Sequence, residues 1–299
     1  MSIAAALHNN RLCAALTGLQ VQEFQDLIEP FRFYYREYWA SQRKNPERAY
    51  GGGRTGCLKT PEEKLFAGLM YLKAYATFDV FGFHIGCDRS QACRRIEHIF
   101  PVLELTLKRK IVLPERKIRS IEEFQKKFPE IKEIMVDGTE RRRQRPKKRK
   151  SQQKTYSGKK KAHTRKNIVV TDKKKKILVI TKTKSGRRHD KRLADKEELF
   201  EHIPKDIDIY ADTAFVGTEK LHPRIFLPKK KPKGRDLTYD EKEINRIISS
   251  YRVLIEHAIG GIKRFQAVTQ VYRNRKAYFD DTLILLAAGL WNYHLSYTS

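Results

Sequence analysis

Three acidic residues stand where carboxylates can hold a divalent metal ion. Asp137 and Asp212 each close a short apolar run, and Glu256 lies on a helix expected over about 239–265. Between the first two lies a basic segment, 141–165, with thirteen Lys or Arg and no acid. Carboxylate oxygens are preferred Mg²⁺ ligands, and basic side chains attract phosphodiesters. The pattern therefore favours metal-assisted cutting of a polyanion, with Mg²⁺ or Mn²⁺ as cofactor and two ions at the site.

Each acid also has a simpler structural interpretation. Asp137 precedes Gly138, and Asp-Gly is a common turn pair. Asp212 is a suitable helix N-cap, and Glu256 can pair with Arg252 four residues earlier on the same helix. Taken singly, these interpretations are the commoner ones. Taken together, the order of the three acids and the adjacent basic segment favour metal ligation.

The charge of the chain points to nucleic acid as its partner. The formal net charge is +28, and 40% of the 299 residues are hydrophobic, which is enough for a folded core. Such a charge needs a polyanion, so a nucleic-acid binder without catalysis is the first alternative.

The four cysteines have neither zinc-site nor disulfide spacing. No apolar stretch is long enough to span a bilayer and no secretory signal is recognisable, which predicts a cytoplasmic, nucleoid-associated protein.

The chain is expected to form three parts. Residues 1–53 read as helical and end at the break Gly51–Gly53. Residues 54–128 read as a helix-turn-helix region, with helices from Pro61, over about 78–84 and over about 88–100, the last ending before Pro101. An ordinary three-helix bundle fits the composition equally well. If the third helix reads DNA, its exposed side chains are the contacts: Ser90, Gln91, Arg94 and Arg95.

Residues 129–299 are expected to form an α/β domain. Five strands are predicted over 131–137, 167–171, 177–183, 207–211 and 224–227, together with a helix near 190–201, a long helix and a buried final helix over about 279–294. This order predicts an RNase H-like mixed five-stranded sheet with helices. Asp137 and Asp212 would then lie at the carboxyl ends of neighbouring strands, the edge where open α/β sheets bind ligands.

Several segments carry a recognisable pattern: Asp137-Gly138-Thr139-Glu140, then 156–166 (Y-S-G-K-K-K-x-H-T-x-K), Gly186-x-x-His189-Asp190, the turn after Asp212, and Arg252-x-x-x-Glu256. In this order they resemble DDE transposases of bacterial insertion sequences, in the broad group related to Harbinger elements. The resemblance covers nearly the whole chain. It implies that Asp137, Asp212 and Glu256 are the DDE metal ligands.

The basic segment is expected to hold the DNA end. With aromatic rings interleaved among the charges, phosphate contacts and stacking are both expected. The expected contacts are Arg141, Arg142, Arg143, Tyr156, Lys159, Lys160, Lys161, His163 and Lys166. His189 and Asp190 are expected as active-site auxiliaries, or, in the simpler interpretation, as a helix start capped by Asp190.

The resulting hypothesis is a DNA transposase that binds terminal inverted repeats, cleaves the element ends and joins the 3′-OH ends to target DNA. Because two ends must be paired, a dimer or a larger complex on DNA is expected. Two alternatives stay open: a non-catalytic DNA-binding protein derived from a transposase, and an RNase H-like nuclease without strand transfer.

Overall fold

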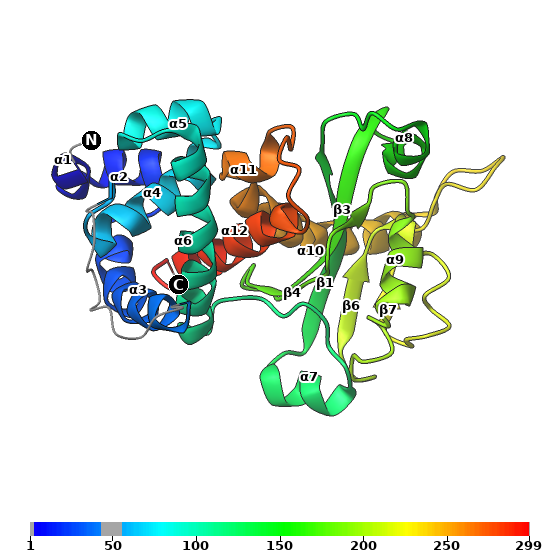
Figure 1. Ribbon diagram of the computed structural model, residues 1–299. Coiled ribbons are helices and arrows are strands. Elements are labelled where there is room, and N and C mark those ends of the chain that lie inside the picture. The colour runs from blue at the N-terminus through cyan, green and yellow to red at the C-terminus, as the bar shows by residue number, and fades with distance from the viewer. Residues whose placement is uncertain (1–2, 43–55, 299) are drawn as a thin grey trace. The chain divides into compact units, whose positions relative to one another are not determined.

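The computed structural model describes residues 3–42 and 56–298 (Figure 1). The chain forms two compact units. The helical unit comprises 1–113, 263–270 and 282–299, and the sheet unit comprises 114–262 and 271–281. This division differs from the three consecutive parts expected with boundaries at 53 and 128. The expected break at Gly51–Gly53 lies outside the described residues.

The helical unit contains the expected helix-turn-helix elements. The cap of α4 is the capping box predicted at Thr60, whose hydroxyl accepts from Glu63 N–H while the Glu63 carboxylate accepts from Thr60 N–H. The Asp88 carboxylate accepts two backbone N–H bonds at the start of α6. The bounds are α1 Ile3–Leu7, α2 Asn10–Thr17, α3 Val21–Ser41, α4 Pro61–Ala74, α5 Phe78–Ile85, α6 Arg89–Arg109 and α11 Gln266–Thr269.

Helix α6 is longer than predicted. The expected end before Pro101 is wrong, because Pro101 lies inside the helix. A proline removes one intrahelical hydrogen bond. Here the helix continues because it buries an apolar face on both sides of Pro101, including Ile99, Val102 and Leu103.

The final helix, α12 (Phe279–Leu295), is buried as predicted. Most of it belongs to the helical unit, where the Tyr293 hydroxyl donates to Glu23 O at 2.9 Å and the Asn292 amide donates to Val112 O at 2.8 Å. Residues near the end of the sequence therefore complete the core of the helical unit, most of which is formed by residues 1–113.

The sheet unit is built on one mixed sheet (Figure 1). All five predicted strands are present, and two strands of two residues each are added to them. The main path runs β2-β3-β1-β6-β7, and β4 and β5 also pair with β3. The bounds are β1 Glu133–Arg142, β2 Tyr156–Ser157, β3 Ala162–Thr171, β4 Ile177–Ile180, β5 Lys184–Ser185, β6 Asp208–Ala211 and β7 Ile225–Phe226.

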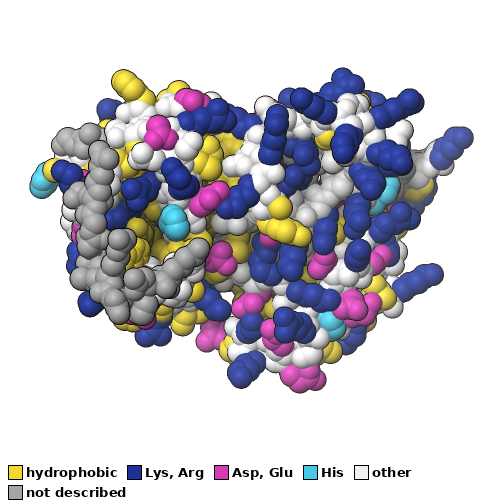
Figure 2. Space-filling view, viewed as in Figure 1, with side chains coloured by type: hydrophobic (Ala, Val, Ile, Leu, Met, Phe, Trp, Pro, Cys, Tyr) yellow, Lys and Arg dark blue, Asp and Glu magenta, His cyan; other side chains and the backbone are white. Residues whose placement is uncertain are grey.

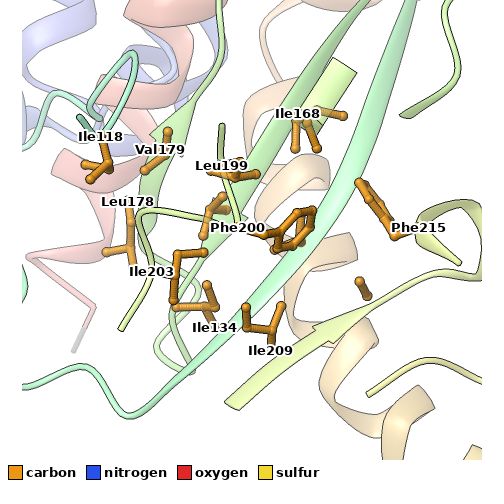
Figure 3. Close-up of a cluster of buried hydrophobic side chains, with 14 of the residues drawn as sticks. Ile118, Ile134, Ile168, Leu178, Val179, Leu199, Phe200, Ile203, Ile209 and Phe215 are labelled. Atoms are coloured by element: carbon orange, nitrogen blue, oxygen red, sulfur yellow. The ribbon is translucent and has the colours of Figure 1, made fainter. Parts of the chain in front are cut away.

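A cluster of aliphatic and aromatic side chains fills the core of the sheet unit (Figure 3). Ile134 and Ile209, from adjacent strands, pack with Phe200 and Phe215 in this cluster. Because these side chains are almost fully buried, they fix the ends of β1 and β6 relative to each other. The helices of this unit are α7 Ile121–Lys127, α8 Arg149–Thr155, α9 Asp190–Lys196, the 3₁₀ helix η1 Thr213–Phe215, and α10 Tyr239–Lys263.

Strand β1 continues beyond the expected end at Asp137. Its parallel pairing with β6 stops at Val136, opposite Ala211, whereas its antiparallel pairing with β3 continues to Arg142. Asp137 is therefore not a turn residue. It lies inside a strand, at the point where the neighbouring strand has ended.

Candidate active site

The sheet brings Asp137 and Asp212 next to each other. Val136 and Ala211 are partners in the parallel register of β1 and β6, so the two aspartates are the next residues on adjacent strands. Each carboxylate accepts a hydrogen bond from the N–H of the following residue, at 2.7 Å from Gly138 and at 2.6 Å from Thr213. These local bonds fix both side chains at the edge where the β1–β6 pairing ends. Asp212 is also the N-cap of η1, so its capping and ligand interpretations are compatible.

Helix α10 brings the third acid to the same edge. The guanidinium of Arg252 lies 3.8 Å from Asp212 Oδ2 and 3.8 Å from Glu256 Oε1. These two oxygens are therefore separated by at most twice that distance. Both contacts are longer than hydrogen bonds, so Arg252 acts as a counter-charge between the acids. The Glu256 side chain is 57% exposed, so solvent reaches it while one carboxylate oxygen lies near Arg252.

Burial makes the ionised form of Asp137 costly. Burial raises its pKa above the ordinary value, and the negative charges of Asp212 and Asp190 raise it further. The Gly138 N–H and the Arg252 charge act in the opposite direction, although burial outweighs them. Three carboxylates therefore influence one another here, and a cation bound beside Asp137 would relieve their repulsion.

Asp190 is held beside Asp137 by a buried ion pair. Lys166 Nζ lies 2.9 Å from Asp190 Oδ1 and donates to Arg188 O at 2.9 Å. The side chains of Lys166 and Asp190 are 8% and 14% exposed. A Cβ atom on Gly138 would lie 2.6 Å from Asp190 Oδ1, so only glycine permits this approach. Asp190 is the first residue of α9 rather than its cap; the N-cap is His189, which is exposed and makes no side-chain capping bond.

The donors at this edge suit a hard divalent cation. Carboxylate oxygens from Asp137 and Asp212 form a pair at one sheet edge, and the raised pKa of Asp137 marks an accumulation of negative charge. Within the described ranges, however, no three or more His, Cys, Asp or Glu side chains form a group that could hold a metal ion. Two aspartates are thus in place, while Glu256 is turned toward Arg252.

Two residues expected to contact DNA are buried instead. Arg141 is 6% exposed and donates to Asn167 Oδ1 at 2.9 Å and to Thr183 Oγ1 at 3.1 Å. Burial lowers its pKa to about 10. Lys166 is 7% exposed and forms an ion pair with Asp190. Both side chains are thus closed to solvent where DNA contact was expected. Arg141 pairs in register with Arg165, and Lys166 pairs with Glu140, so the two side chains point to opposite faces of the sheet, and both faces are covered at these positions.

The remaining basic positions of the segment are accessible. Arg142, Tyr156 and Lys159–Lys161 are exposed, and Arg143 and His163 are half-buried. Figure 2 shows Lys and Arg side chains gathered over the region of β3 and α8. In the helical unit, Ser90, Gln91 and Arg94 on α6 are exposed and Arg95 is half-buried. The expected DNA contacts other than Arg141 and Lys166 therefore present at least part of their surface to solvent.

The sequence did not reveal which side chains lie beside Lys166 and Tyr156. Glu140 accepts a hydrogen bond from the buried Thr164 and lies 3.9 Å from Lys166, yet no periodicity marks it. Arg145 and Arg187 line an open groove beside Tyr156, although they are far apart in the sequence. The Gly186-x-x-His189-Asp190 motif was the available signal for the Asp190 contact.

A bilayer-crossing helix is not found within 3–42 and 56–298, because none there combines the required length with sufficient apolar character.

Comparisons with known proteins agree with this arrangement. Residues 56–109 match a family described as the helix-turn-helix of DDE superfamily endonuclease. A probable transposase for insertion sequence element IS702 of Microchaete diplosiphon is 36% identical over 112 residues, which is 37% of this chain and 39% of that protein. The aligned part thus spans well under two thirds of that relative. No solved structure matches the chain.

The largest match covers the residues of the candidate site. Residues 136–292 match the family described as DDE superfamily endonuclease. With the helix-turn-helix match, this confirms the expected fold class, an RNase H-like α/β domain preceded by a helical DNA-binding region. The match spans Asp137, Asp212 and Glu256 and more than half of the sequence, and the chain therefore belongs to the DDE superfamily endonuclease family.

Proposed function

We propose that this protein is a DNA transposase that cuts the ends of a mobile element and joins them to target DNA. The observation that carries the proposal is the register that sets Asp137 and Asp212 side by side, with Glu256 linked to them through Arg252. Family membership and the transposase relative support it. The helix-turn-helix region would bind the terminal inverted repeats through α6, and the exposed basic segment would hold the DNA end.

The three acids would hold one or two Mg²⁺ or Mn²⁺ ions. Asp137 and Asp212 would supply the fixed ligands, and Glu256 the ligand that leaves Arg252. A divalent ion held by these carboxylates would lower the pKa of an attacking water or 3′-OH and would stabilise the leaving oxygen. Arg252, released from Glu256, stays beside Asp212 as a positive charge that can meet the DNA phosphate. The Asp190 carboxylate, held by Lys166, would lie beside Asp137 and help to fix its position.

The test is cleavage of a duplex that contains the element end, with Mg²⁺ present. The wild-type protein is expected to nick the end and, with target DNA added, to give joined products. Asp137→Ala is expected to abolish both while end binding persists. Asp195→Ala is the matched control and should retain activity, because this half-buried acid of α9 pairs with Lys191 and not with the acids of the site. Cutting by Asp137→Ala would contradict the metal-ligand role, and nicks without joined products would favour a nuclease without strand transfer.

One observation favours a second candidate, a DNA-binding protein without catalysis. Glu256 lies beside Arg252, and among the described residues no group of three or more His, Cys, Asp or Glu side chains is placed to hold a metal ion. This candidate predicts end binding with a steep salt dependence and no cleavage at any Mg²⁺ or Mn²⁺ concentration.

A further inference from the structure

An open groove on the sheet unit lies apart from the three acids. Its volume is about 880 Å³, and its lining includes Tyr156, His163, Arg145 and Arg187. None of the residues that line it is acidic. The groove therefore combines aromatic rings with positive charge, which is the combination that binds single-stranded nucleic acid.

The aromatic part of the groove is rigid. Tyr156 and His163 are cross-strand partners of β2 and β3, with ring centroids 5.6 Å apart and an interplanar angle of 70°. His163 Nδ1 lies 3.1 Å from Thr155 Oγ1, which fixes the imidazole. Tyr156 is nevertheless 43% exposed. An edge-to-face pair of this kind leaves one phenol face open for a further ring.

The two arginines are held at the groove by its own backbone and amides. Arg145 donates to Gln152 Oε1 at 3.1 Å, and the Gln152 amide donates to Pro146 O at 2.8 Å. Arg187 donates to Gln153 O at 3.3 Å. Because both guanidinium groups are already oriented, little side-chain freedom is lost when they meet a phosphate. Burial and the charges of Arg145 and Arg143 lower the pKa of His163, which favours the neutral imidazole near pH 7.

Strand β3 connects the groove to the candidate active site. His163 lies six residues before Val169, the partner of Asp137 in β1. At roughly 3.3 Å per strand residue the separation along β3 is about 20 Å. This corresponds to about six base pairs of duplex at 3.4 Å each, so one DNA end can reach both places.

We propose that the groove binds an unpaired nucleotide of the DNA end, with the base stacked on Tyr156 and the flanking phosphates on Arg145 and Arg187. Paired bases have both faces covered by their neighbours in the stack, whereas an unpaired base offers a free face to an aromatic ring. The groove thus distinguishes an opened or single-stranded end from an intact duplex. The proposal rests on the proposed function, because it names the form of DNA that this site would hold.

The test compares two DNA molecules in EDTA, so that no cutting interferes. One is a blunt duplex, and the other is the same duplex with an unpaired single-stranded extension. Fluorescence anisotropy should show the wild-type protein binding the extended DNA roughly 5- to 150-fold more tightly, the range expected from base stacking. Tyr156→Ala should remove this advantage without weakening blunt-duplex binding. Tyr156→Phe should retain it, and Tyr239→Ala, at another exposed tyrosine, should not affect it.

A cross-linking measurement does not depend on how the variants fold. Bromouracil placed in the extension of DNA bound to wild-type protein should cross-link to Tyr156 or to a neighbouring residue of the groove. Equal affinity of the wild-type protein for both DNA molecules would overturn the proposal, as would a Tyr156→Ala loss that is the same for both, or cross-links confined to other surfaces. Any of these results would leave the Mg²⁺-dependent cutting test untouched, so failure of the groove and failure of the proposed function remain distinguishable.

Discussion

Replacing Lys166 by methionine should destabilise the protein strongly. Its ammonium group lies 2.9 Å from Asp190 Oδ1, donates to Arg188 O, and is almost inaccessible to water. Methionine keeps the length and the apolar stem of the side chain but removes the charge. The Asp190 carboxylate would then stay beside Asp137 without its partner, since Asp190 is the first residue of α9 and its backbone position does not depend on Lys166.

The size of the effect follows from burial. Breaking a buried ion pair by removing one partner costs about 3–5 kcal/mol, because the remaining charge is left unpaired. For 299 residues that unfold together, with an unfolding entropy of about 2.1 cal/mol/K per residue, that corresponds to a fall in Tm of roughly 5–8 °C. The matched control is Lys191→Met in α9, the helix that begins at Asp190. Its pair with Asp195, at 2.8 Å, has side chains 31% and 38% exposed, so a cost of at most about 1 kcal/mol is expected.

Urea unfolding followed by circular dichroism would measure both free energies at neutral pH. The double variant Lys166→Met, Asp190→Asn provides a further check. Removing both charges should restore most of the lost stability, because no unpaired carboxylate remains. A Lys166→Met cost as small as that of Lys191→Met would refute the reasoning and show that the ammonium group is solvated. A double variant no more stable than Lys166→Met would show that lost packing, and not lost charge, is responsible.

Three further outcomes are expected. Because the pKa of Asp137 is raised in the folded protein, its ionised form lowers the free energy of unfolding at neutral pH. The Asp137→Asn variant should therefore unfold at a higher urea concentration than the wild type at pH 7. This difference should shrink as the pH falls toward about 3.9, the pKa of an aspartate in the unfolded chain. Gly68→Ala should lower the free energy of unfolding, measured by thermal unfolding, by about 1–3 kcal/mol, because the new methyl group would lie 2.5 Å from Ile99 Cγ2. Gly260→Ala should raise it by about 0.5–1 kcal/mol, because this glycine lies in helix α10 and a methyl group there would meet nothing within 4 Å. Arg142→Gln, on the exposed side of β1, should reduce the slope of log affinity against log salt by about 0.9, as measured by DNA-binding titrations at several salt concentrations.

Local patterns predicted most of the elements. Apolar runs located the five main strands, and the cap at Thr60 placed the start of α4 correctly. The same runs located Asp137 and Asp212, because the end of an apolar run coincides with the end of the β1–β6 pairing. What local patterns could not show was the continuation of β1 to Arg142: its residues are polar and charged, and only pairing with β3 keeps them in a strand.

Contacts between distant segments account for the other differences. Nothing near Lys166 in the sequence indicates that its charge is buried against Asp190, because the pairing depends on where α9 begins in space. Helix α8 has no buried side chain, so it has no apolar periodicity to reveal it. The expected end of α6 at Pro101 failed because packing on both sides of the proline outweighed its local preference.

The division of the chain into units constrains how binding specificity can be exchanged with a relative. The helical unit draws on three separate stretches, 1–113, 263–270 and 282–299, and the last of these supplies Asn292 and Tyr293 to its interior. A hybrid protein that takes only residues 1–113 from a relative would pack the relative's helices against the α12 of this chain. Transfer of a new end-recognition surface therefore requires that all three stretches travel together.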